Sequence, residues 1–248
     1  MLVLLGAAFL TAAAAQAQNG WKTAWSYEGA GGPEHWGSLD PDYAACNAGR
    51  EQSPLDIRSA VKADLPGLRF DYQSGPLRIV NNGYTAVRVD YVHSGDFLIV
   101  ANRRYELTQF HFHHPSEEHI RGKAYDMVIH LMHRATDGRV AAVAVLLKEG
   151  RANAAVEQLW EHMPQAAGQA VGVPGVEINP AALLPHDTAY YTYMGSLTAP
   201  PCTEGVEWFV LKTPVEISAG QIDAFARLYP QDVRPVQPLN GRVVKESR

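Results

Sequence analysis

The segment Gln109-Phe-His-Phe-His113 carries the clearest chemistry in this chain of 248 residues. Successive side chains of a strand point to opposite faces, so His111 and His113 would share one face while Phe110 and Phe112 occupy the other. Two imidazoles on one face can reach a single metal ion. The pair alone is a weak signal, because histidines in half-buried strands are often ordinary hydrogen-bonding residues.

A third histidine, His130, lies in the apolar segment Val128-Ile-His-Leu-Met132. If this segment forms a strand beside the first, its imidazole reaches the same ion. Three neutral imidazoles suit zinc, and three protein ligands leave the fourth position open for water, as catalytic sites require. The sequence therefore favours a catalytic Zn²⁺ site, provided that the two strands are neighbours.

The elements around these histidines are mostly predicted strands. Alternation and apolar runs indicate strands over Val87–Val92, Thr108–His113, Asp126–His133 and Val140–Leu147, the last suited to a central position. Helices are expected over Ala152–His162 and Ser218–Leu228. The second of these begins with a capping box formed by Ser218 and Gln221. Residues 18–52 are rich in Gly, Pro and Trp, and we expect them to be irregular and packed over the core.

The N-terminal segment and the two cysteines of the chain indicate export. Residues 1–17 resemble a signal peptide, with an apolar start and Ala15-Gln16-Ala17 as the cleavage pattern. The alternative, a membrane span, requires a longer and less alanine-rich run. Cys46 and Cys202 would pair in an oxidising compartment, and two buried free thiols are the alternative. A net charge of −5 without a basic block argues against nucleic acid as a partner.

Beyond these patterns, the chain resembles the α-class carbonic anhydrases, here a bacterial and exported member. The matching segments occur in family order and cover nearly all of residues 18–248. They are Trp25-Ser-Tyr27, Gly32-Pro-Glu-His-Trp36, Gln52-Ser-Pro-Leu-Asp-Ile57, Asn81-Asn-Gly83, Gln109-Phe-His-Phe-His113, Ser116-Glu-Glu-His119, His130-Leu-Met-His133, Gly195-Ser-Leu-Thr198, Pro200-Pro201, Trp208-Phe-Val-Leu-Lys212 and Arg234-Pro-Val-Gln-Pro238.

The resemblance implies a fold and a reaction. The fold is mixed but predominantly β, a single domain with a central, largely antiparallel twisted sheet of about ten strands and short peripheral helices. The reaction is the reversible hydration of carbon dioxide to bicarbonate and a proton by zinc-bound hydroxide, and the zinc ligands are His111, His113 and His130. Two alternatives stay open, a related binding protein without catalysis and a zinc esterase or hydrolase. The family also leaves open a homodimer, and it suits a periplasmic or secreted location.

Residue roles follow from the same resemblance. Thr198 would orient the hydroxide, and Glu118 would accept a hydrogen bond from the Thr198 hydroxyl, with Glu117 as the alternative in register. A nonpolar wall for carbon dioxide would consist of Leu197, Met132, Ala142, Val206 and Trp208. Thr198 and Ala199 would complete the substrate-binding residues. Polar residues of the cavity would be Tyr27, Asn82 and Gln109. Met132 and Ala142 replace the usual valines, one larger and one smaller, so that the pocket volume is roughly kept.

Two departures from the family bear on rate and metal binding. Many relatives place a glutamate two residues before the third ligand, where this chain has Val128. Tyr84 occupies the position of the histidine that shuttles protons in fast members. Zinc lowers the pKa of its bound water to about 7, a value for which this family is the reference case. Passing that proton directly to water is uphill by roughly nine pK units, about 12 kcal/mol. Such a barrier limits turnover to about 10⁴ s⁻¹.

Overall fold

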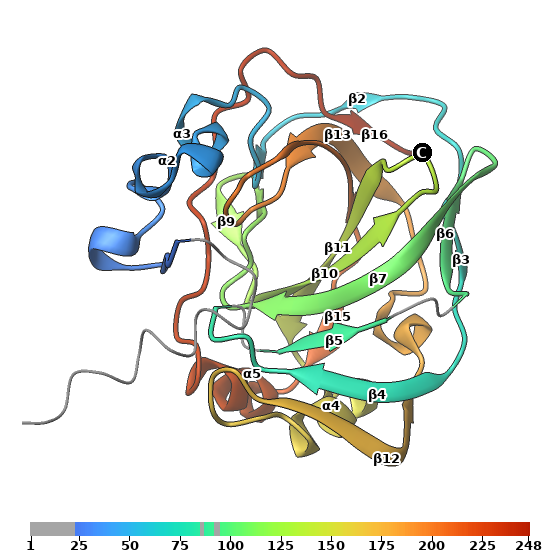
Figure 1. Cartoon of the computed structure of the whole chain (residues 1–248). Helices are drawn as coiled ribbons and strands as arrows, with labels where there is room; N and C mark the ends of the chain where they lie inside the picture. Colours follow the sequence, from blue (N-terminus) through green and yellow to red (C-terminus); the bar gives the residue numbers. More distant parts are fainter. Residues whose placement is uncertain (1–22, 85–86, 92–94) are drawn as a thin grey trace, which may run out of the picture.

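The computed structural model describes residues 23–84, 87–91 and 95–248 of the chain. One strongly curved sheet dominates the fold, and short helices flank it on two sides (Figure 1). The large sheet has thirteen strands, and a separate small sheet has three. The predominantly β architecture predicted from the sequence is therefore confirmed, with a wider sheet than the expected ten or so strands.

The strands have the following bounds. They are β1 (Asp56–Ile57), β2 (Val61–Lys62), β3 (Arg69–Asp71), β4 (Gly75–Val80), β5 (Arg88–Asp90), β6 (Phe97–Val100), β7 (Arg103–His113), β8 (His119–Ile120), β9 (Lys123–Ala124), β10 (Met127–Arg134), β11 (Val140–Glu149), β12 (Ala170–Ile178), β13 (Tyr190–Ser196), β14 (Glu204–Leu211), β15 (Val215–Ile217) and β16 (Lys245–Glu246).

The large sheet is mixed. Its main path runs β12-β4-β5-β7-β10-β11-β14-β13-β16-β2, with β15 beside β11, and with β6 between β7 and β3. Most neighbours in this sheet are antiparallel, as predicted. The parallel exceptions are β11 with β14, β11 with β15, and β16 with β2. The apolar run that suggested a central strand forms β11, which has neighbours on both sides.

The two faces of the central strands carry different residues. On one face, Phe110, Phe112, Ile129 and Leu131 are fully buried in the main hydrophobic core. The other face bears the histidines and a second, smaller apolar cluster that includes Val128. The period-2 pattern of residues 108–113 thus predicted the two faces of β7 correctly.

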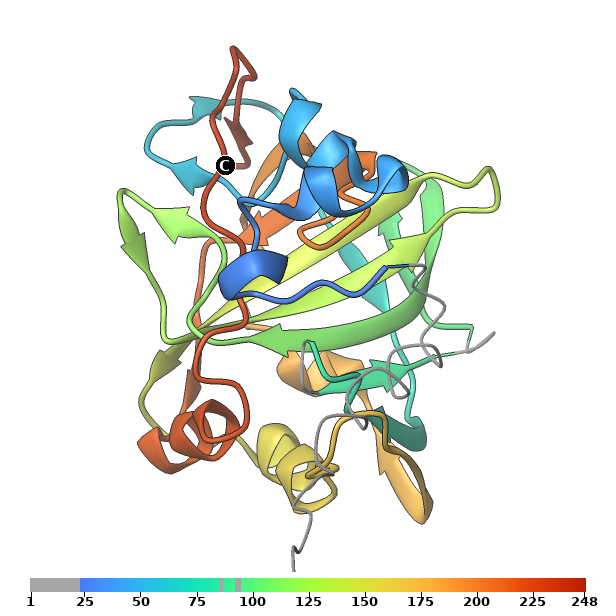
Figure 2. The same ribbon diagram turned by 60° about the vertical axis from the view of Figure 1, so that its left-hand side comes forward.

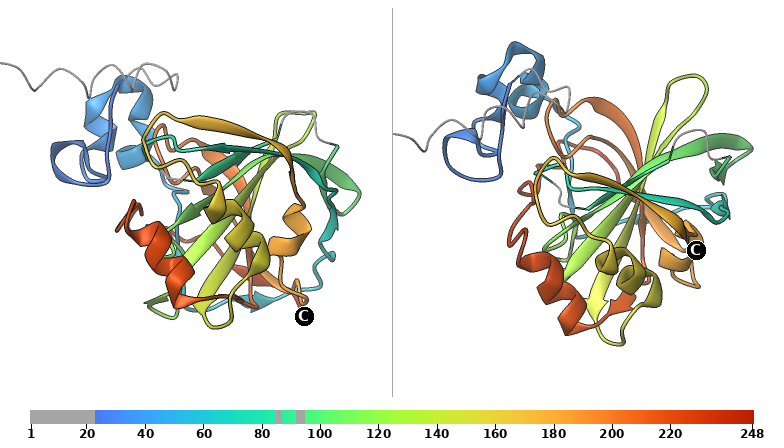
Figure 3. Two further views of the ribbon diagram at one scale, coloured as in Figure 1. Left: turned by 90° about the horizontal axis from the view of Figure 1, so that it is seen from below. Right: turned by 60° about the horizontal axis from the view of Figure 1, so that its bottom comes forward.

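Two helices cover the face that carries the phenylalanines. α4 (Ala154–Glu161) and α5 (Ala219–Ala226) lie side by side there (Figure 3). Phe112 of the sheet contacts Trp160 and Phe225, whose rings stack at 5.7 Å. Both helices were predicted, and the capping box of Ser218 and Gln221 is present at the start of α5.

The N-terminal part of the described chain folds into short helical turns. These are η2 (Gly29–Gly31), α2 (Trp36–Leu39), η3 (Pro41–Tyr43) and α3 (Ala45–Ala48), and η4 (Pro180–Leu183) follows later in the chain. In the described part of residues 18–52, the four N-terminal turns replace the irregular path that was expected. They lie over one end of the sheet, near the loop between β13 and β14 (Figure 2). A cluster of Trp25, Trp36, Tyr43 and the two cysteines holds them there.

Two predictions concern export and membrane insertion. The proposed signal peptide, residues 1–17, lies outside the described residues. Within the described part of the chain, no helix has the length and apolar character needed to cross a membrane.

Candidate metal centre

The three predicted ligands come together at the centre of the sheet. His111 of β7 and His130 of β10 are directly paired in register, and His113 pairs with Val128. The strand adjacency that the sequence could only suppose is therefore confirmed. One nitrogen from each ring lies within 4.8 Å of the other two.

Each imidazole is held through its second nitrogen. His111 Nδ1 lies 2.8 Å from Gln109 Oε1, and His113 Nδ1 lies 2.7 Å from the backbone oxygen of Asp232. His130 Nε2 lies 3.0 and 3.2 Å from the two carboxylate oxygens of Glu118. These contacts leave Nε2 of His111, Nε2 of His113 and Nδ1 of His130 to face one another.

The electrostatics suit a cation. Burial lowers the pKa of His111 well below its usual value, and the neighbouring His113, His130 and Arg88 lower it further. Burial also lowers the pKa of His113, so both rings are neutral at pH 7. His113 Nε2 is buried without a hydrogen-bond partner. Burial lowers the pKa of His130, but the Glu118 and Glu117 carboxylates outweigh burial and raise it. A metal ion at the point where the three rings meet would satisfy the unpaired nitrogen of His113 and favour the neutral form of His130.

The prediction about the adjacent residues Glu117 and Glu118 is wrong in one respect. Glu118 was expected to accept from Thr198, yet its carboxylate contacts His130 instead. The Thr198 side chain interacts with the Glu117 carboxylate and lowers the pKa of that group. The contact is loose, since Glu117 Oε2 has no hydrogen-bond partner within the usual distance and angle. The chain bends at residues 117–118, so the two carboxylates reach opposite sides of the His130 ring: Glu118 lies 3.0 Å from Nε2 and Glu117 lies 3.8 Å from Nδ1. Glu117, named as the alternative in register, is therefore the partner of Thr198.

Glu117 is itself fixed in place. Its Oε1 accepts from the backbone N–H of Arg234 at 2.8 Å. Burial raises the pKa of Glu117 to about 7, and the charge of Glu118 adds to that rise, while His130, Arg234 and Thr198 oppose it. A metal cation nearby would favour the ionised form of this carboxyl group.

A cavity of about 150 Å³ opens onto the histidines. Most of the predicted pocket residues line it: Asn82, Tyr84, Gln109, Met132, Leu197, Thr198, Ala199 and Trp208. Ala142 and Val206 do not appear in this lining and lie in the apolar cluster behind it, with Met132 and Trp208. Met132 and Ala142 are cross-strand partners, so the large residue faces the small one.

Other side chains of the cavity were missed or misplaced. Tyr27 packs against the rings of Trp25 and Trp36 and is not part of the lining. Trp25, Arg88 and Pro200 line the cavity without having been predicted to do so. For Arg88 a signal existed, since Val87 and Val89 alternate with it and are fully buried. Arg88 therefore takes the other face, directly opposite His111.

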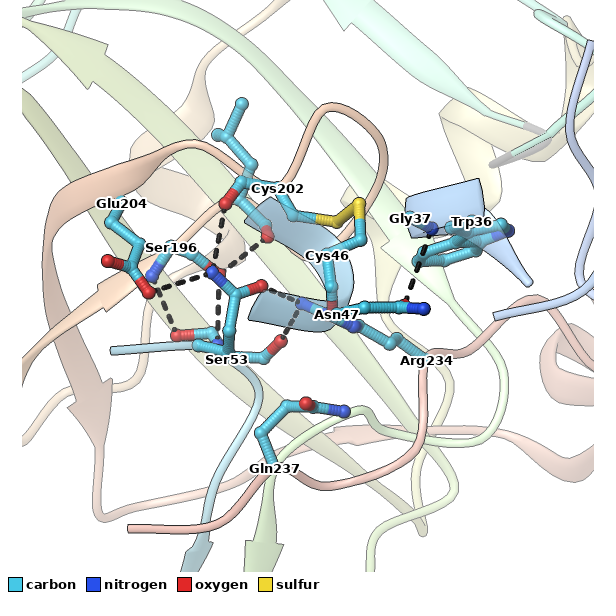
Figure 4. Close-up of a disulfide and its surroundings, with 12 residues drawn as sticks. Trp36, Gly37, Cys46, Asn47, Ser53, Ser196, Cys202, Glu204, Arg234 and Gln237 are labelled. Atoms are coloured by element: carbon cyan, nitrogen blue, oxygen red, sulfur yellow. Dashed lines mark hydrogen bonds between the residues drawn. A yellow bond between two sulfur atoms is a disulfide. The ribbon is translucent and has the colours of Figure 1, made fainter. Parts of the chain in front are cut away.

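The disulfide supports the segment that carries Thr198. Cys46 and Cys202 are bonded, which confirms the predicted pairing, and they tie α3 to the loop between β13 and β14. The buried Arg234 guanidinium donates to the Cys46 carbonyl at 2.7 Å and to the Ser53 carbonyl at 2.8 Å (Figure 4). The loop carrying Thr198 is thereby attached to a rigid scaffold.

Comparison with known proteins identifies the family. A model of the eukaryotic-type carbonic anhydrases matches residues 31–248. The chain belongs to the carbonic anhydrase family. A carbonic anhydrase from Klebsiella pneumoniae is 42% identical over 99% of this chain and 100% of its own length. One from Nostoc sp. is 43% identical over 90% of this chain and 86% of its own.

Solved structures agree with this assignment. The α-carbonic anhydrase of Thermovibrio ammonificans, in complex with the inhibitor sulfanilamide, is 42% identical. It superposes with a TM-score of 0.87 over 92% of this chain and 100% of that one. As a carbonic anhydrase the chain is an enzyme, and its three-histidine group lies on the neighbouring strands β7 and β10.

Proposed function

We propose that this carbonic anhydrase hydrates carbon dioxide reversibly with a Zn²⁺ ion held by His111, His113 and His130. The observation that carries the proposal is the convergence of three imidazole nitrogens within 4.8 Å, each ring held through its other nitrogen. Three nitrogen donors and one open side toward the cavity match catalytic zinc sites. Bound zinc supplies a water of lowered pKa and a Lewis-acid field.

Thr198 and Glu117 orient the attacking water. An ionised carboxylate can only accept hydrogen bonds, so Glu117 directs the Thr198 hydroxyl proton toward itself. The Thr198 oxygen is then left to accept a hydrogen bond from the attacking water. This arrangement turns a lone pair of that water toward the substrate, and the buried Arg234 contact keeps Glu117 in position.

The apolar wall holds the other reactant. Leu197, Met132 and Trp208 line the cavity beside the histidines. An apolar surface favours carbon dioxide, which has no net dipole, over ordered water. The bicarbonate product is charged and gains less from this wall, so the same surface assists its release.

Export and assembly belong to the proposal as well. We infer removal of residues 1–17 as a signal peptide and a periplasmic or secreted enzyme, which the Cys46–Cys202 disulfide supports. A homodimer is the oligomer we propose to test by light scattering.

A stopped-flow assay of carbon dioxide hydration, with and without a zinc chelator, tests the central claim. We expect activity to be lost with the chelator and restored by added Zn²⁺. Bound zinc without hydration activity would instead indicate a binding protein. A kcat/KM for ester hydrolysis above that for hydration would indicate a hydrolase.

A further inference from the structure

The third ligand, His130, differs from the other two in what supports it. Gln109 supports His111 through a neutral amide oxygen, and a backbone carbonyl supports His113. The second nitrogen of His130 is instead hydrogen-bonded to a side-chain carboxylate, that of Glu118. The carboxylates nearest His113, those of Glu117 and Asp232, lie 3.5 and 3.7 Å from its ring nitrogens. Both Glu118 oxygens lie within 3.2 Å of Nε2.

This contact sets which nitrogen of His130 carries the proton. An ionised carboxylate only accepts, so Nε2 must donate to it. The lone pair of the neutral ring is then on Nδ1, the nitrogen that faces His111 and His113. Glu118 thus selects the tautomer that a metal ion requires.

The carboxylate is rigidly placed. Glu118 is 0% exposed and His130 is 1% exposed, so water does not compete for the contact. The Ser116 hydroxyl donates to the Glu118 backbone oxygen at 2.7 Å. The next residue, His119, begins β8 and pairs with Asp56 of β1. The small three-stranded sheet therefore anchors the segment that carries Glu118.

The strand of His130 itself offers no such support. Val128, two residues earlier, shares the face of His130 on β10 and is fully buried in the apolar cluster. Its side chain has no hydrogen-bond acceptor. The partner of the ring therefore has to come from outside β10, and Glu118 provides it.

We propose that Glu118 is a positioning residue that orients His130 and sets the affinity for zinc. It would do from the β7–β8 connection what an acidic side chain at position 128 would do from β10. This inference rests on the proposed zinc enzyme, so its test begins by measuring zinc binding to the unchanged chain.

The test is a set of four variants, Glu118→Gln, Glu118→Ala, Val128→Glu and the double variant Glu118→Ala/Val128→Glu. The dissociation constant for zinc is measured by competition with a chelator, and the melting temperature is measured without metal. We expect the two Glu118 variants to bind zinc roughly 10- to 100-fold more weakly. The double variant should recover most of that loss, because the carboxylate introduced by Val128→Glu shares the face of His130.

A matched control is Glu207→Gln. Glu207 accepts from Tyr105 at 2.8 Å and lies away from the cavity lining, so its loss should leave zinc affinity unchanged. Zinc affinity within about twofold of the unchanged chain in both Glu118 variants would overturn the inference, since it lies far below the expected loss. So would a double variant as weak as Glu118→Ala while Val128→Glu alone binds normally. Failure of the unchanged chain to bind zinc would instead overturn the proposed function.

Discussion

Tyr84 is the residue from which we predict a limit on turnover. Its ring lies 4.3 Å from that of Trp25, nearly parallel to it, at the wall of the cavity. Burial raises the pKa of Tyr84 above its ordinary value near 10. A phenol that holds its proton so firmly cannot relay protons near pH 7, where histidine can.

The Tyr84→His variant should therefore raise kcat in weak buffer and shrink the acceleration that added imidazole gives. We expect a kcat of about 10⁴ s⁻¹ for the unchanged chain without imidazole. Stopped-flow hydration at several imidazole concentrations measures both effects. Tyr84→Phe is the control, since it keeps the stacked ring and should leave the imidazole dependence intact. A kcat of about 10⁶ s⁻¹ without buffer dependence would contradict this prediction.

Glu117 and Glu118 are neighbours with separable roles. Glu117→Gln puts an amide where Thr198 needs an acceptor, so we expect kcat to fall by about 10²- to 10³-fold while zinc affinity changes little. Parallel measurements of kcat and of the zinc dissociation constant on Glu117→Gln check this. Equal losses of zinc affinity in the Glu117→Gln and Glu118→Gln variants would contradict it.

The same pair marks a limit of sequence reasoning at this scale. Ser116-Glu-Glu-His119 shows that a carboxylate lies near the site but not which of two serves Thr198. The choice depends on how the connection after β7 turns before β8 begins. That path is set by contacts distant in sequence, such as that of His119 with the Leu55 carbonyl at 3.1 Å.

Among the elements, those with a strong local pattern were predicted well. The alternation of β7, the apolar run of β11 and the capping box of α5 are all present. Strand order was not predictable in this way, because the pattern of one strand does not name its partner. The adjacency of β7 and β10, and with it the place of His130, came from family resemblance and is now seen in the register.

The loop between β13 and β14 is the element most dependent on a covalent link. Backbone bonds from Leu197 to Thr203 and from Cys202 to Ala199 close it, and the disulfide fixes it to α3. Replacing both cysteines with alanine should lower the free energy of unfolding by about 2–5 kcal/mol. It should also lower kcat, because Thr198 loses its fixed place.

Urea unfolding and hydration assays of Cys46→Ala/Cys202→Ala measure these two effects. The control is a thiol reductant, which should lower the free energy of unfolding of the unchanged chain and leave that of the double variant unaffected. Unchanged kcat in the double variant would show that the hydrogen bond from Gln52, which Arg234 holds in turn, to the backbone oxygen of residue 202 suffices to hold the loop.

For the whole molecule, the sheet separates two interiors with different chemistry. One side is an apolar core under α4 and α5, and the other holds buried histidines and carboxylates. Histidines kept neutral in the fold become free to bind protons when the chain unfolds. Acid stability is therefore a property of the whole fold, since proton uptake by the unfolded state opposes folding.

His133 gives this effect a test outside the metal site. Its Nε2 lies 2.6 Å from the Tyr72 hydroxyl, and burial lowers its pKa to about 3, against a reference value near 6.5 in the unfolded chain. Between those values only the unfolded state binds the proton, so the free energy of unfolding should fall by about 1.4 kcal/mol per pH unit as the pH drops below roughly 6.5.

Urea unfolding of the zinc-free protein at about pH 7 and about pH 5, on either side of the reference value, measures this slope. His133→Gln, which cannot take up the proton, should show a slope smaller by about that amount, while His114→Gln, at a half-buried position, serves as control. Equal slopes in all three proteins would mean that His133 titrates alike in the folded and unfolded chains.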